Sequence, residues 1–69
     1  MNKLIWLNKA FRGGEVLVNK DYIASAELCD SGYIHISLVT GRDYLIDDFS
    51  AEENPMMAFF SFLEQGEEK

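Results

Sequence analysis

The chain has 69 residues, a formal net charge of −6, one cysteine (Cys29) and one histidine (His35). This length allows at most one domain, and so small a domain buries only about 60% of the surface that its unfolded chain exposes. The composition excludes an intramolecular disulfide and leaves too few ligands for a structural zinc site, and it favours a reducing compartment. Self-association or a partner protein is the stabilising device that remains.

The charge is unevenly distributed along the chain. Residues 1–20 carry four basic side chains against one acidic and sum to +3, whereas residues 21–69 carry two against eleven and sum to −9. Phosphate backbones require clustered Lys and Arg, so we expect no direct nucleic-acid binding. The sequence contains no signal-peptide cleavage pattern, and its longest apolar run is far shorter than the ~20 residues of a membrane span. We therefore expect a cytoplasmic protein that does not contact membranes.

Hydrophobic patterning predicts five strands, at 3–7, 15–19, 21–29, 33–39 and 43–47. Gly13-Gly14 separates the first two and predicts a turn, because a phosphate-binding loop needs a Lys-Ser/Thr signature and a following helix. Asp30-Ser31-Gly32 and Thr40-Gly41-Arg42 supply further turn chemistry. The predicted fold class is α+β: residues 1–69 form one small domain, an antiparallel β-meander of four to five strands with one C-terminal α-helix packed across one face.

The third and fourth strands can be placed in register by their apolar residues. A three-residue loop with Gly32 in the left-handed conformation gives one wholly apolar face, which pairs Leu28 with Ile34, Ala26 with Ile36, and Ala24 with Leu38. The other face then pairs Glu27 with His35, Ser25 with Ser37, and Ile23 with Val39. A two-residue loop would flip every side chain and set Glu27 opposite Ile36, so the pattern favours the three-residue loop. The small Ala24 and Ala26 leave room for a Phe-rich helix to lie across them.

The next hairpin has two alternatives. A two-residue Thr40-Gly41 turn places Leu45 on the core face, whereas a three-residue turn places Tyr44 and Ile46 there. In both cases large apolar residues of the fifth strand face away from the core.

The helix is predicted over residues 55–65, with Asn54 as N-cap, Pro55 at the first helical position and Gly66 ending it. Its core stripe at i, i+3, i+4 and i+7 consists of Met56, Phe59, Phe60 and Leu63. Met57 and Phe62 fall on the two flanks of this stripe. A flat sheet cannot bury both flanks deeply, so we expect the surplus to form a contact surface.

The first strand is apolar on both faces, with Leu4 and Trp6 on one and Ile5 and Leu7 on the other. Such a strand at a sheet edge is a pairing hazard, so it is either central in the sheet or covered by another chain. Two copies could pair into a continuous sheet or stack their faces. The predicted protein-contact residues are Trp6, Tyr44, Met57 and Phe62.

His35 and Glu27 are expected to be cross-strand neighbours, with Asp47 as a possible third member. Cys29 lies on the same face, diagonal to His35, so a Cys–His pair is conceivable. The open sheet face has no cleft that excludes water, and no helix N-terminus lies beside Cys29. We interpret the pair as an exposed ion pair and expect no enzyme activity and no catalytic, cofactor-binding or metal-binding residues.

An acidic band follows the fourth strand and consists of Asp43, Asp47, Asp48, Glu52 and Glu53. It does not match the ligand spacing of a calcium loop. A solvated face is the simplest interpretation. The alternative is a surface that mimics nucleic-acid phosphates and occupies a basic groove.

The runs VLVNKDYIASAE and YIHISLVTGRDYLIDDFSAEE resemble the FlbD/SwrD family of short bacterial proteins tied to flagellar motors. The residues that carry the resemblance are Asn19, Asp21, Ile23, Glu27, the segment 38–42, Glu52 and Glu53. The resemblance implies a small β-meander followed by a C-terminal helix. The chain departs from the family in its longer first turn at 9–14, in Thr40-Gly41 where Asn-Gly is usual, and in its Phe- and Met-rich helix.

These observations predict a small non-enzymatic protein–protein interaction module that associates with itself as a homodimer or larger homo-oligomer. The partner is expected to be another protein, the chain itself, or both, and no cofactor is expected. The alternative hypothesis is an acidic phage or mobile-element inhibitor that occupies a basic surface of a nucleic-acid-handling complex.

Overall fold

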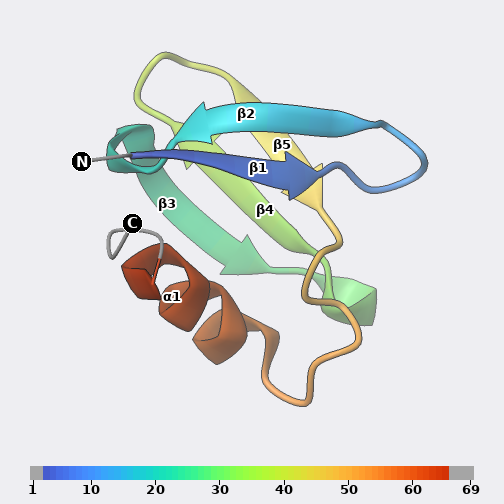
Figure 1. Ribbon diagram of the computed structural model, residues 1–69. Helices are drawn as coiled ribbons and strands as arrows, with labels where there is room; N and C mark the ends of the chain where they lie inside the picture. The colour runs from blue at the N-terminus through green and yellow to red at the C-terminus, as the bar shows by residue number, and fades with distance from the viewer. Residues whose placement is uncertain (1–2, 66–69) are drawn as a thin grey trace.

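A computed structural model describes residues 3–65 (Figure 1). Its elements in chain order are β1 (Leu4–Asn8), β2 (Glu15–Asn19), the 3-10 helix η1 (Lys20–Tyr22), β3 (Ile23–Leu28), the 3-10 turn η2 (Asp30–Gly32), β4 (Ile34–Leu38), β5 (Asp43–Ile46) and α1 (Pro55–Gln65). The predicted α+β class, with antiparallel strands and a C-terminal helix, is confirmed. The predicted helix end at Gly66 lies outside the described residues.

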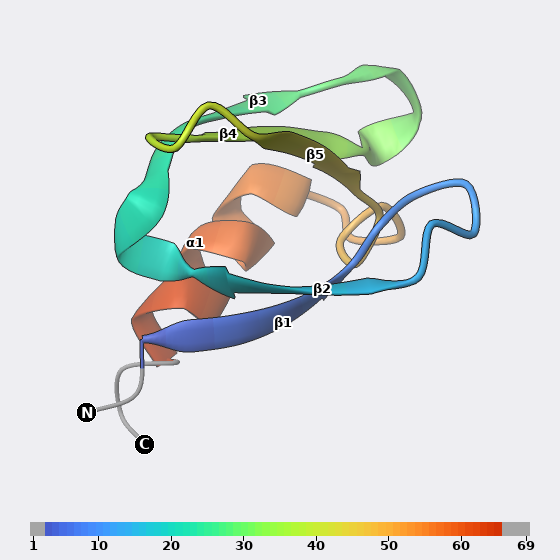
Figure 2. The same ribbon diagram turned by 90° about the horizontal axis from the view of Figure 1, so that it is seen from above.

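Within residues 3–65 the five strands form two sheets, β1-β2 and β3-β4-β5 (Figure 2). The division occurs at η1, where the Asn19 side chain accepts a hydrogen bond from the backbone N–H of Asp21 and the chain turns a corner. The sheets therefore face one another instead of continuing side by side. They meet where β1 ends: Ala10 N–H donates to the Leu45 carbonyl (2.8 Å) and Asp47 N–H to the Asn8 carbonyl (3.1 Å).

The β3–β4 register is confirmed near the loop: Leu28 pairs with Ile34, Glu27 with His35, Ala26 with Ile36, and Ser25 with Ser37. Gly32 adopts φ +84° as predicted, and a Cβ there would lie 2.8 Å from the Ser50 carbonyl oxygen.

The predicted Ala24–Leu38 and Ile23–Val39 pairs are wrong. The register shifts between Ile23 and Ser25, so Ile23 faces Leu38 and Ala24 is the extra residue. Val39 N–H donates instead to the Tyr22 carbonyl of η1 (2.8 Å). A bulge at this point bends the strand as it leaves the corner, which is the usual effect of an inserted residue.

The β4–β5 hairpin follows the three-residue alternative. Leu38 N–H donates to the Arg42 carbonyl (2.8 Å), and Gly41 has φ +97°. Ile34 pairs with Ile46 and Ile36 with Tyr44. This register buries Ile46 and packs Tyr44 against the core, as that alternative predicted.

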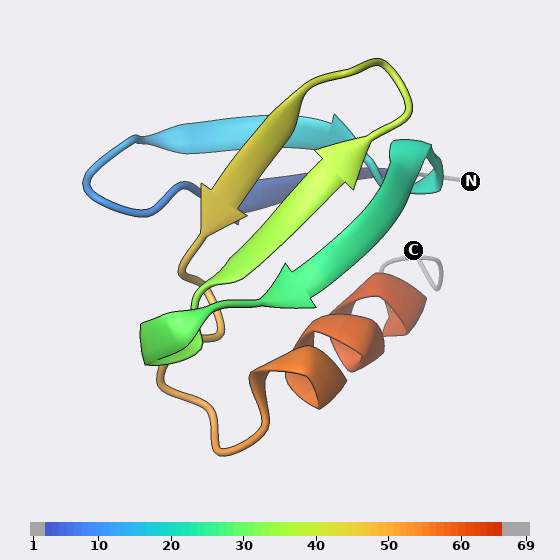
Figure 3. The same ribbon diagram turned by 180° about the vertical axis from the view of Figure 1, so that it is seen from behind.

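The core lies between the two sheets, and α1 closes one open side (Figures 2 and 3). Its fully buried members come from both sheets and the helix: Ile5, Leu7, Val18, Ile34, Ile36, Ile46 and Phe59. Phe49, in the segment before α1, packs its ring against Phe59 and Phe62 at centroid distances of 5.5 and 5.7 Å. Phe49 therefore extends the core along one flank of the helix.

Both ends of α1 are held by side chains. Asn54 Oδ1 accepts from Met57 N–H (3.3 Å), which confirms the predicted N-cap and the place of Pro55 in the first turn. At the other end the ammonium of Lys20 donates to the Leu63 carbonyl (2.6 Å). A cation there satisfies a free carbonyl and opposes the negative end of the helix dipole.

The predicted core stripe is wrong at one position. Met56, Phe59 and Leu63 face the core, but Phe60 is 62% exposed, and Phe62 packs inside in its place. Phe49 supplies apolar neighbours on the Phe62 flank, whereas the small Ala24 and Ala26 of β3 offer little on the Phe60 flank. The buried face of the helix is therefore turned toward Phe62.

Two adjacent phenylalanines test this rotation of the helix. We expect Phe59→Ala to lower the free energy of unfolding by about 3–5 kcal/mol, because it removes a ring that is 2% exposed. Phe60→Ala is the matched control and should change it by less than about 1 kcal/mol, because most of its ring is already in water. Urea denaturation of both variants measures the difference, and equal losses would contradict the packing described here.

Candidate functional site

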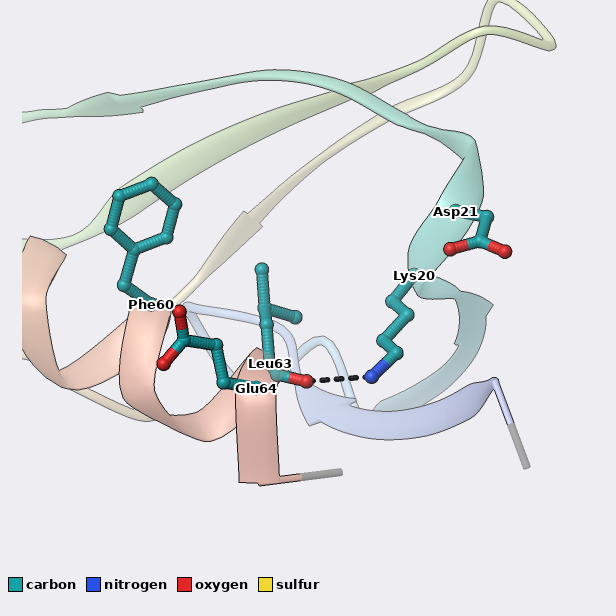
Figure 4. A pocket seen from close by; sticks show the side chains of 5 residues that line it. All are labelled: Lys20, Asp21, Phe60, Leu63 and Glu64. Atoms are coloured by element: carbon teal, nitrogen blue, oxygen red, sulfur yellow. Dashed lines mark hydrogen bonds between the residues drawn. The ribbon is translucent and has the colours of Figure 1, made fainter. Parts of the chain in front are cut away.

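A groove runs between β3 and α1 and has a volume of about 290 Å³. Its lining is mainly apolar and consists of Lys20, Ile23, Ala24, Ser25, Ala26, Met56, Phe59, Phe60 and Leu63. A second hollow of about 220 Å³ shares Lys20, Phe60 and Leu63 with the groove and adds Asp21 and Glu64 (Figure 4). The two hollows share a wall and form one surface feature beside the helix, which we call the β3–α1 groove.

The groove exists because β3 carries small side chains where the helix passes it. Sequence reasoning predicted this room at Ala24 and Ala26 and filled it with the helix. The helix occupies only part of the space, since Phe59 anchors it in the core and Phe60 points outward along the groove wall. The bulge residue Ala24 is itself one of the small side chains that line the groove.

Large apolar side chains remain in solvent on the two elements that form the groove. On the helix, Phe60 is 62% and Met57 59% exposed, and Leu28 at the end of β3 is also exposed. The charged groups gather at one end, where the Lys20 ammonium is bound to the Leu63 carbonyl and Asp21 is paired with Lys3 (2.8 Å). The groove thus offers an apolar lining with charged groups at one end.

The four predicted contact residues fall in two groups. Trp6 and Met57 are 60% and 59% exposed, whereas Tyr44 and Phe62 are half-buried and pack against the core. Met57 lies on α1. Trp6 lies on the outer face of β1, directly opposite Leu17 of β2 and two residues from Leu4. We call these three exposed residues the outer-face patch: Leu4, Trp6 and Leu17.

The acidic band does not form one cluster. Asp43 begins β5 and bonds to His35, whereas Asp47 follows the end of that strand, about 13 Å further along at ordinary strand rise. Asp48 accepts hydrogen bonds from the backbone N–H and side-chain amide of Asn8 (2.8 and 2.7 Å) and so helps to join β1 to the segment after β5. Glu52 and Glu53 are exposed. The acidic-inhibitor hypothesis stays a prediction from the sequence.

His35 lies between two carboxylates on the outer face of the second sheet. Its Nε2 is 2.9 Å from Asp43 Oδ2, and its Nδ1 is 4.0 Å from Glu27 Oε1. The predicted Glu27 neighbour is confirmed, but the second carboxylate is Asp43 and not Asp47. Both ring nitrogens thus face carboxylates rather than the Cys29 thiol. Among residues 3–65, no group of three His, Cys, Asp or Glu side chains is placed to hold a metal ion.

The β1–β2 turn was not predicted in its observed form. Phe11 and Arg12 have φ of +59° and +60°, and Gly13 N–H donates to the Ala10 carbonyl (3.1 Å). Two consecutive positive φ values are typical of a type I′ turn, for which Asn-Gly is the usual sequence. Gly13-Gly14 indicated a turn, but the sharpest part precedes them. Phe11 remains largely exposed and packs edge-on against Tyr33, with ring centroids 5.3 Å apart.

Comparison with protein-family models, curated proteins and solved structures finds no match to this chain. The resemblance to the FlbD/SwrD family therefore stays a prediction from the strand and turn residues that carry it. In the described part of the chain, no helix has the length and apolar character needed to cross a bilayer.

The strained turn gives a stability prediction. Left-handed backbone costs about 1–2 kcal/mol at a residue with a side chain, so we expect Arg12→Gly to raise the free energy of unfolding by about 1 kcal/mol. Gly14→Ala is the matched control, because φ is +81° there and the opposite change should destabilise. Thermal unfolding followed by circular dichroism measures both. A loss of stability in Arg12→Gly would show that the arginine side chain contributes more than its backbone costs.

Proposed function

We propose that the protein is a small non-enzymatic interaction module. It binds an apolar segment of a partner protein in the β3–α1 groove, and it also associates with itself. The observation that carries the proposal is the exposure of Phe60 and Met57 beside an apolar groove on a domain of 69 residues. Apolar side chains gathered in solvent and rimmed by polar residues mark interaction sites.

The energetics support a partner at this place. Complete burial of a large apolar side chain contributes about 1.5–3 kcal/mol, and Phe60 and Met57 each retain more than half of their surface for that purpose. The groove also offers a concave wall, where a ligand side chain contacts several neighbours at once. A flat patch of the same area would bind less tightly, because fewer atoms would surround each buried group.

The net charge of residues 21–69 indicates which residues of a partner would flank its apolar segment. Residues 21–69 carry a net −9, and Asp21 and Glu64 line the groove end. A partner with basic residues flanking its apolar segment would be attracted at a distance and held at the rim, more strongly at low salt. The apolar contacts supply the binding energy and the charges select the partner.

The proposal predicts that Phe60→Glu abolishes capture of the partner. Tagged wild type, Phe60→Glu and Ser61→Glu are used to retrieve proteins from the native cell, and the bound proteins are quantified by mass spectrometry. Ser61→Glu is the matched control, because it adds the same charge at an exposed position of the same helix. A protein held by wild type and Ser61→Glu but lost from Phe60→Glu, by about tenfold or more, supports the groove.

Two results would count against the groove. Equal capture by all three proteins would place the binding site elsewhere, for example at the outer-face patch. Loss of capture by both charged variants would indicate a general effect of charge or folding, and circular dichroism of the purified variants separates these causes.

A further inference from the structure

The open edge of β2 lacks the devices that usually prevent strands from pairing between molecules. Such devices include bulges, proline, lysine and cover by another element. The edge of β5 is met by residues 8–10, at the end of β1 and just beyond it, and β3 has both its bulge and the neighbouring helix. In contrast, β2 pairs regularly with β1 over all five residues, and its sequence EVLVN carries a single charge, at Glu15.

The backbone of β2 turns N–H and C=O groups outward along this edge. Lys20 N–H donates to the Lys3 carbonyl (2.9 Å) and Lys9 N–H to the Gly14 carbonyl (2.7 Å) at the two ends of the β1–β2 ladder. Since antiparallel pairs alternate, the bonded pairs between these ends are Ile5–Val18 and Leu7–Val16. Glu15, Leu17 and Asn19 consequently direct their N–H and C=O groups away from β1, and the Asn19 carbonyl, at the N-cap of η1, also accepts the first hydrogen bond of that turn. Within the described residues, β1 is the only strand beside β2 (Figure 1).

We propose that two copies of the chain pair antiparallel along β2, about a two-fold axis at Leu17, to form a continuous sheet β1-β2-β2-β1. This inference rests on the self-association in the proposed function and gives it a surface and a geometry. Leu17 of each copy exchanges its N–H and C=O with Leu17 of the other. Glu15 faces Asn19, and Val16 faces Val18.

The register follows from the sequence of the edge. Only residues 15, 17 and 19 direct their backbone N–H and C=O groups toward the second copy. A two-fold axis must therefore place each of these residues opposite another residue of the same set. Only the register centred on Leu17 pairs all five residues of the strand. Centring on Glu15 would set two carboxylates opposite each other, which is destabilising. The chosen register also aligns Trp6 and Leu17 of one copy with Leu17 and Trp6 of the other in one apolar row.

The charge distribution favours this approach. Each copy has a net charge of −6, which opposes association through most of its surface. The β1–β2 hairpin belongs to the first 20 residues, which sum to +3, so contact through β2 brings together the segment of each chain that is not acidic. A second copy is therefore a better occupant of this edge than of the acidic surface around β5 and the segment that follows it.

Sedimentation velocity across about 10 μM to 1 mM protein tests the proposal. This range suits a five-residue edge, which falls among the smaller interfaces. We expect wild type to shift from monomer to dimer with concentration, and Leu17→Lys to remain monomeric, because it sets two ammonium groups on the axis. Leu4→Lys is the matched control on the same outer face, since Leu4 and Leu17 are 48% and 44% exposed. Leu4→Lys should dimerise like wild type.

Cross-linking gives a second measurement that does not depend on disrupting the strand. In a Cys29→Ser background, Leu17→Cys places two sulfurs on a bonded pair with Cα atoms about 5.5 Å apart, within the range of a disulfide. Under mild oxidation this variant should form a covalent dimer at least tenfold faster than Leu4→Cys.

A wild type that stays monomeric to 1 mM, a Leu17→Lys variant that still dimerises, or equal cross-linking of the two cysteine variants would each overturn the proposal. The groove is tested separately, because Phe60→Glu lies on α1 and should leave cross-linking at Leu17 unchanged. Loss of partner capture by Phe60→Glu with intact cross-linking at Leu17 would support the groove, whereas failure of cross-linking with normal partner capture would overturn the β2 pairing alone.

Discussion

The corner at Lys20 is the constraint on which the rest of this small structure depends. The backbone N–H of Lys20 donates to the Lys3 carbonyl and so closes the β1–β2 ladder. Lys20 is also the first residue of η1, and its ammonium binds the Leu63 carbonyl at the end of α1. One residue thus connects the first sheet, the turn to the second sheet and the helix. The corner is also why the sheets face one another, which creates an interior that the helix can close. Without a disulfide, a polar contact of this kind fixes the helix end relative to both sheets.

The arrangement explains why apolar side chains remain outside. Two small sheets that face each other bury only their inner sides, and one helix closes only one of the gaps between them. Leu4, Trp6 and Leu17 are therefore left on the outer side of the hairpin, and Met57 and Phe60 on the outer side of the helix. The sequence predicted more large apolar side chains than the core can bury, and Trp6 and Met57 are indeed exposed. At Phe62 and Tyr44 the fold accommodates side chains that a single flat sheet would have left exposed.

Local patterning predicted the elements of this chain well and their relative placement less well. Alternation of apolar residues, turn chemistry and the Asn54-Pro55 start located every strand and the helix, and the loop at Gly32 followed from pairing arguments alone. The corner η1 was missed, since residues 21 and 22 were assigned to the third strand. The rotation of α1 depends on Phe49, which lies in a segment without regular structure. The spacing of apolar residues within the helix carries no information about such a neighbour. The bulge at Ala24 likewise depends on the corner that precedes it. Positive φ at Phe11 and Arg12 contradicts their local preference, so no sequence rule for turns indicates it.

The groove and the open edge of β2 are linked through the same corner. Lys20 lines the groove, binds the Leu63 carbonyl through its ammonium and directly follows β2, the strand that we propose pairs with a second copy. A symmetric pair would present two grooves, and a partner with two apolar segments would bind the second with a high effective concentration. Binding and self-association would then be thermodynamically coupled, each changing the other by the same factor. That coupling arises from the partner's two segments, because Lys20 contributes its side chain to the groove but only its backbone N–H to the β1–β2 ladder.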